Sequence, residues 1–347
     1  MSSVAVRDDL VIGVDVGGTK VAAGLVDANG EILCHNRNPM VSSGTAADGL
    51  ASVIKAIETA SAQAVSIAGG HHLIRGIGIC APGPLDPKTG VVINPPNLPC
   101  WRDFPLAAEV AKIYRVRVKV DNDANAAGLA ETLWGSGRGY HNVFYATLGT
   151  GIGTAIIFDG RIYHGRTGAA GEGGHMSIDY NGPHCGCGKP GCIEVLAAGP
   201  AIARRARATL ESGRTSSLLD LAGGKLESVT SQLVGQAAAA GDPVASEVLH
   251  ETVRLLACWF GNIIDLLDPD VIIVGGGVAS MMKPFFGEIV DRLPEFAVNQ
   301  RCKEIPFVSA RYGEDSGIAG GAALCFVARD AATGEEALRP SELTVKQ

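Results

Sequence analysis

The sequence predicts an α/β protein of two lobes that face a cleft, and three observations support this fold class. A pattern of apolar strand, Gly/Thr break, second apolar strand and turn occurs at residues 10–33 and recurs at residues 143–164. Segments typical of strands alternate with segments of helical spacing along the chain. Glycine loops and acidic residues follow the predicted strands, where open α/β sheets place their ligands. The recurrence indicates a duplicated fold in which each copy begins one lobe.

The first half of the chain alternates between strands and helices. The stretch LVIGVDVGGTKVAAGLVDANGEIL, residues 10–33, begins as a buried strand, breaks at Gly17-Gly18-Thr19, resumes as a strand and turns at DANG. Residues 46–68 have the apolar spacing of a helix. We then expect a strand with a Pro/Gly turn and a short strand (74–93), a helix (104–114), a strand ending in acids (116–123) and a helix (124–134).

The second half opens with the recurring pattern. The stretch VFYATLGTGIGTAIIFDGRIYHG repeats the first one, with DG in place of NG at the turn. Chance similarity between two hairpins is the alternative, but both copies place Gly and Thr at the break. Residues 198–267 are expected to be mostly helical, and residues 270–280 to form a strand that runs into a glycine turn. A last helix is expected within residues 316–328.

The length of 347 residues allows two domains, or one large α/β unit with a deep cleft. We assign residues 1–135 to a small lobe and residues 136–316 to a large lobe. Residues 317–330 form a C-terminal helix that returns to the small lobe, and residues 331–347 are a polar tail in this prediction.

Composition and charge exclude several classes of protein. Apolar residues make up 46% of the chain and charged residues 19%, which favours a large core over disorder. The net charge of −7, without a long Lys/Arg run, argues against a nucleic-acid or anionic-membrane surface. No segment has the N-terminal signal pattern or the roughly 18 to 20 apolar residues of a membrane span. Nine cysteines without an export signal predict reduced thiols and a metal site in a soluble, cytoplasmic protein.

Three glycine loops that follow predicted strands are candidates for binding a nucleotide. Glycines let backbone N–H groups approach phosphate oxygens without a Cβ in the way. The Asp15 carboxylate can hold a magnesium-bound water, and the third loop leaves room for a flat adenine or ribose. The candidates are Asp15, Gly17, Gly18, Thr19 and Lys20 in the first loop, Gly149, Thr150 and Gly151 in the second, and Gly275, Gly276 and Gly277 in the third.

Any one of these loops alone is better explained as an ordinary turn, and only the three together favour a nucleotide cleft. The chain lacks the Walker A spacing, and GTGIGT only resembles the G-x-G-x-x-G motif of dinucleotide sites. The residues after GTGIGT, AIIFDG, are typical of a strand rather than a helix. A Rossmann dinucleotide site therefore does not fit.

Three polar residues, Asp121, Asn122 and Asp123, end a predicted strand and precede a small-residue helix. One of them can serve only to cap the helix, since Asp and Asn are common N-cap residues. Three in a row exceed what capping needs. A carboxylate here can accept the proton of a hydroxyl group that attacks a phosphoryl group.

The stretch GAAGEGGHMSIDYNGPHCGCGKPGCIEV, residues 168–195, brings cysteines and histidines into one glycine-rich loop. Cys185, Cys187 and Cys192 supply soft thiolates that favour Zn²⁺, which takes four tetrahedral ligands. The fourth ligand is His175 or His184, and we favour His175 because adjacent residues rarely both reach one ion. A redox centre lacks the C-x-x-C spacing, an iron–sulfur cluster needs a fourth cysteine, and three incidental buried thiols are the remaining alternative.

With four protein ligands the zinc has no open position for water, so its predicted role is structural. It would fix the loop that carries Glu172, His175 and Glu194, whose oxygens and ring nitrogen can hydrogen-bond sugar hydroxyls. A pocket of short acids and imidazole suits a polyol, because an unpaired polar group in such a pocket is costly.

These motifs resemble those of ROK-family sugar kinases, and the resemblance covers roughly residues 10–328. CGCGKPGCIE (185–194) fits the family pattern CxCGxxGCxE, EGGH (172–175) fits ExGH, and NDAN (122–125) fits the catalytic strand end. DVGGTK and LGTGIG fit its two phosphate loops. Thr154 departs from the family, in which glycine is frequent at that position, and so leaves the fine shape of the second loop open.

The resemblance implies the actin-like, ribonuclease-H-like two-lobed kinase fold with a duplicated βαβ core. It implies Asp123 as general base for the sugar 6-hydroxyl, and a zinc held by His175, Cys185, Cys187 and Cys192, with His175 joining metal and sugar through its two nitrogens. It implies ATP and Mg²⁺ as co-substrate and cofactor, and a homo-oligomer, dimer or tetramer. The implied sugar-binding residues are Gly83, Asn122, Asp123, Glu172, His175 and Glu194.

Within the resemblance, PNLPCW and GEGGHMSID are most similar to the glucokinases of the family. Fructokinases, N-acetylmannosamine kinases and N-acetylglucosamine kinases share nearly all of these residues and remain alternatives. ADP or polyphosphate also remain open as phosphoryl donors. The family also contains sugar-responsive repressors with a helix-turn-helix domain ahead of the first loop. Only about nine residues precede the first strand here, and Asp15 and Asp123 argue against a sensor without catalysis.

Overall fold

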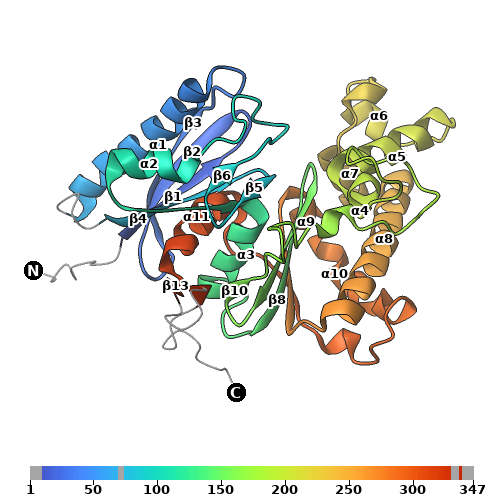
Figure 1. The fold of residues 1–347 in the computed structure, drawn as a ribbon. Coiled ribbons are helices and arrows are strands. Elements are labelled where there is room, and N and C mark those ends of the chain that lie inside the picture. The colour runs from blue at the N-terminus through green and yellow to red at the C-terminus, as the bar shows by residue number, and fades with distance from the viewer. Residues whose placement is uncertain (1–9, 69–73, 330–335, 338–347) are drawn as a thin grey trace, which may run out of the picture. The chain divides into compact units, whose positions relative to one another are not determined.

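Two sheets with the same order of strands form the framework of the protein (Figure 1). The computed structural model describes residues 10–68, 74–329 and 336–337. These residues divide into two compact units. The first unit holds the described residues up to His141, Ala155–Gly171 and the described residues from Arg311 onward, and the second holds Asn142–Thr154 and Glu172–Ala310.

The first sheet runs in the order β3 (Ile32–Pro39), β2 (Lys20–Val26), β1 (Leu10–Val16), β4 (Ile74–Ala81), β7 (Arg117–Asn122). β1 pairs antiparallel with β2 and parallel with β4, and β4 pairs parallel with β7. β1 and β2 are buried along nearly their whole length, which explains their continuous apolar sequences. The parallel register places Cys80 opposite Asp15 on one side and Asp121 on the other, at the carboxyl edge of the sheet.

The second sheet runs in the order β10 (Arg161–Ile162), β9 (Ile152–Phe158), β8 (Asn142–Leu148), β11 (Val271–Gly275), β12 (Phe307–Ser309). In this sheet β11 pairs parallel with β8 on one side and with β12 on the other. β10 pairs antiparallel with β9, just as β3 pairs antiparallel with β2 in the first sheet. Each strand thus has a counterpart at the same position of the first sheet. The predicted duplication is confirmed, and chance similarity between two hairpins does not explain it.

Helices and short strands complete both units. In the first unit they are α1 (Ala46–Ala68), β5 (Leu85–Asp86), β6 (Val91–Val92), α2 (Leu106–Tyr114), α3 (Asp123–Trp134), a 3-10 helix (Gly313–Asp315), α11 (Ser316–Phe326), β13 (Ala328–Arg329) and β14 (Glu336–Ala337). In the second unit they are α4 (Ile193–Ala197), α5 (Gly199–Glu211), α6 (Leu218–Leu221), α7 (Ser231–Ala239), α8 (Pro243–Leu267), α9 (Gly277–Met282), α10 (Phe286–Arg292) and 3-10 helices at Gly173–His175, Leu226–Ser228, Lys283–Phe285, Leu293–Glu295 and Cys302–Glu304.

The order of elements agrees with the sequence prediction at most places. The predicted helix over residues 46–68 has the bounds of α1, and α2, α3 and α11 lie within or one residue beyond their predicted segments. β3 was not predicted, because its half-exposed sequence ILCHNRNP lacks an apolar run. Residues 136–141, 155–171 and 311–316 group with the first unit, whereas the sequence prediction assigns all of residues 136–316 to one large lobe. The predicted polar tail, residues 331–347, lies outside the described residues except for β14.

The core of the first unit consists of apolar residues from the sheet, α1 and α2, with Trp101 fully buried among them.

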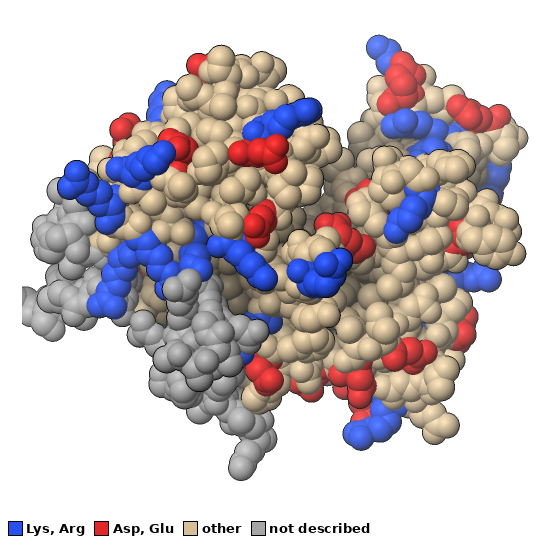
Figure 2. Space-filling model, in the orientation of Figure 1, with Lys and Arg blue, Asp and Glu red and all other residues tan. Residues whose placement is uncertain are grey.

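Basic and acidic side chains both occur on the face shown in Figure 2. Among the helices of residues 10–68 and 74–329, none has the length and apolar character needed to cross a bilayer.

Candidate functional site

The junction of β7 and α3 carries the candidate base. β7 ends at Asn122, and the Asn122 side chain caps α3 by accepting the N–H groups of Ala124 at 2.9 Å and Asn125 at 3.3 Å. Asp123 is exposed, and its Oδ1 accepts the Ala124 N–H at 2.8 Å. Asn122 thus supplies the N-cap of α3, and the carboxylate of Asp123 lies exposed beside it. Gly83 lies beside Asn122, where a Cβ on Gly83 would be 3.7 Å from Asn122 Nδ2.

Asp121, the first residue of the triplet, has a different role. It is only 4% exposed. Its Oδ1 accepts the Asn122 N–H at 2.7 Å and the Asn125 side-chain amide at 3.1 Å. Its Oδ2 lies 2.7 Å from Nε2 of His164. Asp121 is therefore a buried anchor of the turn that precedes Asp123, and sequence analysis did not identify His164 as its partner.

The first glycine loop joins β1 to β2 in the first unit. Gly17 N donates to Lys20 O at 2.9 Å, and Thr19 and Lys20 are exposed. Burial raises the pKa of Asp15, while the Cys80 thiol, 3.7 Å from Asp15 Oδ1, and the charges of Lys20 and Arg37 act in the opposite direction. The backbone of this loop thus lies next to the half-buried carboxyl group of Asp15, and Lys20 supplies a nearby positive charge.

The second and third glycine loops lie together in the second unit. Gly149 N donates to Gly151 O, and Gly149 O accepts the N–H of Gly199 at the start of α5, both at 2.9 Å. β11 ends at Gly275 and α9 begins at Gly277, with Gly276 between them at φ +92°. A Cβ at Gly276 would lie 2.4 Å from Leu148 O, directly before the second loop. The two predicted nucleotide loops are therefore in contact, and this contact requires glycine at position 276.

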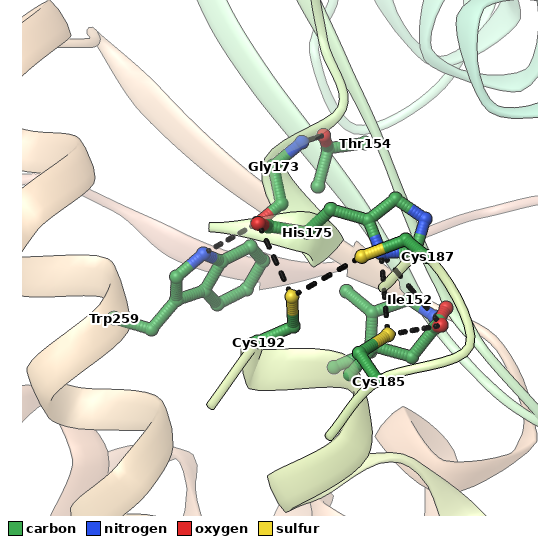
Figure 3. Close-up of polar contacts among 9 residues, drawn as sticks. Ile152, Thr154, Gly173, His175, Cys185, Cys187, Cys192 and Trp259 are labelled. Carbon is green, nitrogen blue, oxygen red and sulfur yellow. Dashed lines mark hydrogen bonds and ion pairs between the residues drawn. The ribbon is translucent and has the colours of Figure 1, made fainter. Parts of the chain in front are cut away.

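The predicted metal ligands form one cluster in the second unit (Figure 3). Ligand atoms of His175, Cys185, Cys187 and Cys192 all lie within 4.8 Å of one another. Cys185 Sγ is 3.7 Å from His175 Nδ1, and the sulfurs of Cys187 and Cys192 are 3.6 Å apart. Ligands about 2.3 Å from a tetrahedral zinc would be separated by about 3.8 Å. His184 is exposed and lies outside this cluster.

Backbone hydrogen bonds shape the loop that carries three of these ligands. Cys185 N donates to Lys189 O at 2.8 Å and Gly188 N to Cys185 O at 2.9 Å, which closes the loop around the thiols. Burial raises the pKa of Cys192, whereas the backbone N–H of Lys189 lowers the pKa of Cys187. Three adjacent thiolates repel one another without a cation between them. Three sulfurs and one imidazole are the ligand set that Zn²⁺ prefers, so the residues fit this metal.

The candidate sugar-binding residues of the second unit adjoin this cluster. Glu194 lies in the first turn of α4, and its Oε2 accepts the Ile152 N–H at 2.9 Å while its Oε1 lies 3.8 Å from Cys185 Sγ. Glu172 is exposed at the start of the 3-10 helix that ends at His175. The structure brings Glu172, His175 and Glu194 into one unit and Gly83, Asn122 and Asp123 into the other.

Thr154, where the sequence departs from the expected glycine, supports the segment that leads to His175. It is 3% exposed, and its Oγ1 accepts the Gly173 N–H at 2.9 Å (Figure 3). Gly173 O accepts the indole N–H of Trp259 at 3.0 Å. The sequence pointed to Thr154 only as part of the second glycine loop and did not point to Trp259, because only the fold brings these two residues to Gly173.

Family membership follows from comparison with known proteins. The sequence profile described as the ROK family matches residues 11–327, which is most of the chain. The chain belongs to the ROK family. A ROK family glucokinase from Streptomyces griseus, solved in complex with glucose and AMPPNP, is 35% identical, covers 91% of this chain and 98% of its own, and has a TM-score of 0.75. The predicted ROK resemblance and its actin-like fold class are confirmed.

Other ROK relatives have two kinds of names. The glucokinase of Thermotoga maritima is 33% identical over 90% of this chain and 96% of its own length. The xylose repressor of Bacillus spizizenii is 33% identical over 61% of this chain and 53% of its own length. This chain is thus similar to a kinase over nearly the whole of both proteins, and to a repressor over about half of the repressor.

Proposed function

We propose that this ROK-family chain is a glucokinase, a sugar kinase that transfers the γ-phosphoryl group of ATP to the 6-hydroxyl of glucose. The observation that carries the proposal is the exposed Asp123 carboxylate next to Asn122, whose side chain supplies the helix cap. The similarity to glucokinases over nine-tenths of the chain, one of them bound to glucose and AMPPNP, supports the choice of substrates.

In the proposed reaction Asp123 accepts the proton of the 6-hydroxyl as that oxygen attacks the γ-phosphorus. The bond between this oxygen and phosphorus forms, the bond from the γ-phosphorus to the bridging oxygen breaks, and ADP leaves. Asn122, Glu172, His175, Glu194 and Gly83 orient the sugar hydroxyls. Such positioning lowers the barrier by placing the reacting atoms in contact before reaction.

The proposed nucleotide contacts come from the three glycine loops, Asp15–Lys20, Gly149–Gly151 and Gly275–Gly277. Asp15 would hold Mg²⁺ through a bound water, and this ion supplies charge neutralisation at the transferring phosphate. Backbone N–H groups of the loops and the Lys20 ammonium bind the phosphate oxygens.

A structural zinc is part of the same proposal. His175 Nδ1 and the sulfurs of Cys185, Cys187 and Cys192 would hold it, which leaves His175 Nε2 for a sugar hydroxyl. The ion supplies rigidity and charge compensation for the thiolates. We also propose a homo-oligomer, dimer or tetramer, that works in the cytoplasm.

A coupled assay of purified protein with Mg-ATP tests this function across glucose, fructose and the N-acetylhexosamines, with ADP and polyphosphate as alternative donors. We expect glucose with ATP to give the highest kcat/KM. Equal rates across the sugars would contradict the glucose assignment. The second candidate is a sugar-sensing regulator, favoured by the match to a xylose repressor, and sugar binding without turnover of any hexose would support it.

A further inference from the structure

His164 has no assigned part in the proposed reaction. Its side chain nevertheless contacts Asp121, which belongs to the same triplet as the proposed base Asp123. His164 follows β10, and Nε2 is 2.7 Å from Asp121 Oδ2. The His164 side chain is 29% exposed and that of Asp121 is 6% exposed. An ionised carboxylate has only acceptors, so Nε2 carries the proton and donates it. Such charge-assisted hydrogen bonds in a shielded place are stronger than neutral ones.

The backbone on both sides of His164 is held in place. Tyr163 N donates to Ile156 O at 2.8 Å, and Ala170 N donates to His164 O at 3.1 Å. The segment Ala155–Gly171, which carries His164, groups with the first unit, as do β7 and α3. The imidazole thus reaches Asp121 from a loop of the same unit whose backbone is fixed by hydrogen bonds.

The other oxygen of Asp121 holds the backbone and a side chain of the β7–α3 turn. Asp121 Oδ1 accepts the backbone N–H of Asn122 and the side-chain amide of Asn125. These two residues flank Asp123, and the Asn125 N–H also binds the Asn122 side chain. A carboxylate held at one oxygen by His164 can keep its other oxygen fixed on both residues. Without that donor the carboxylate can rotate, and the turn before α3 loosens.

We propose that His164 is a positioning residue, which orients Asp121 and, through the β7–α3 turn, sets the direction of the Asp123 carboxylate. The inference rests on the proposed function, since it concerns the base of that reaction. His164 does not act on the sugar or the nucleotide itself. Its loss therefore changes the rate of the bound complex more than substrate binding.

The test compares His164→Met, which removes the donor at similar length, with His164→Gln, whose amide nitrogen can take the place of Nε2. We expect His164→Met to lower kcat by about tenfold or more, because small misplacements of a reacting group cost rates of this size, with KM for glucose and ATP changed less than about threefold. His164→Gln should restore kcat to within about threefold of wild type. His250→Gln, which alters a similar pair with Glu288 at 2.8 Å, is the matched control and should leave kcat unchanged.

Several outcomes would overturn the inference. An unchanged kcat in His164→Met, or an equal loss in His164→Met and His164→Gln, reduces His164 to a structural brace. If His164→Met raises KM for glucose and leaves kcat normal, His164 binds the sugar and does not position the base. Should His164→Met fail to fold, ¹⁵N spectra of the imidazole in wild-type protein still decide, since an unprotonated Nε2 excludes the donor role. Wild-type protein that phosphorylates no hexose refutes the proposed function itself and removes the inference with it.

Discussion

Glu194 Oε1 lies 3.9 Å from Nδ1 of His175, while the other oxygen of the same carboxylate accepts the Ile152 N–H. One side chain thus links the cysteine–histidine cluster to the strand that follows the second glycine loop. Metal binding, sugar binding and the placement of that loop are expected to depend on one another through this contact.

Replacing Cys187 by Ser should abolish zinc binding. Three remaining ligands hold zinc far less tightly than four, and the loop from residue 183 to residue 192 would lose its cross-link. Metal analysis should give about one zinc per wild-type chain and almost none in the variant, with a lower Tm. Cys258→Ser, in α8 and outside the cluster, should keep its zinc. A zinc-free Cys187→Ser protein with full stability and activity would show that the ion is dispensable.

Glu194→Gln should weaken sugar binding and leave the loop intact. The amide oxygen of Gln can still accept the Ile152 N–H, but the negative charge toward the sugar is lost. We expect KM for glucose to rise about tenfold, the size of a lost hydrogen bond to a charged group, and KM for ATP to change little. Steady-state kinetics measure both, with Glu247→Gln on α8 as control. An unchanged KM for glucose would remove Glu194 from the sugar site.

Gly276→Ala should damage the third loop. The positive φ strains any side chain, and the new Cβ would meet Leu148 O at 2.4 Å. We expect a loss of about 1 to 3 kcal/mol in the free energy of unfolding and a raised KM for ATP. Gly287→Ala in α10, where a Cβ meets nothing within 4 Å, is the control and should be neutral or slightly stabilising. Equal stability of Gly276→Ala and wild type would contradict the close approach.

Asp15→Asn should abolish turnover and stabilise the fold at neutral pH. Burial raises the pKa of Asp15 above its ordinary value of 3.8, so the unfolded chain releases this proton at a lower pH than the native chain. Ionised Asp15 therefore lowers stability above about pH 4. The Tm of Asp15→Asn should exceed that of wild type at pH 7, and the difference should shrink as the pH falls toward 3.8. A lower Tm for the variant at pH 7 would mean that Lys20 and Arg37 outweigh burial.

Local sequence patterns predicted those helices, loops and strands that are determined by residues close together in the chain. The helix over residues 46–68 follows from apolar spacing, and Cys185, Cys187 and Cys192 lie within one short loop. His175 was favoured over His184 on steric grounds, and the structure places it with the thiols. The repeated glycine hairpin predicted the duplicated sheets, because both copies carry the same break between two apolar strands.

Contacts between distant segments could not be predicted in this way. His164 and Asp121 are 43 residues apart, and neither belongs to a pattern that requires the other. Thr154 and Trp259, which are far apart in the sequence, both bind Gly173. β3 lacks an apolar run because it is half-exposed, and the place of Ala155–Gly171 in the first unit depends on tertiary packing alone.

Asp123→Asn tests most directly whether Asp123 is the base that receives the proton of the sugar hydroxyl. The two side chains have the same shape, so titration calorimetry should give a Kd for glucose within about threefold of wild type. The coupled assay should show kcat reduced by about 100-fold or more, because only proton acceptance has been removed. Turnover of Asp123→Asn at the wild-type rate would contradict the account and assign the base to another residue.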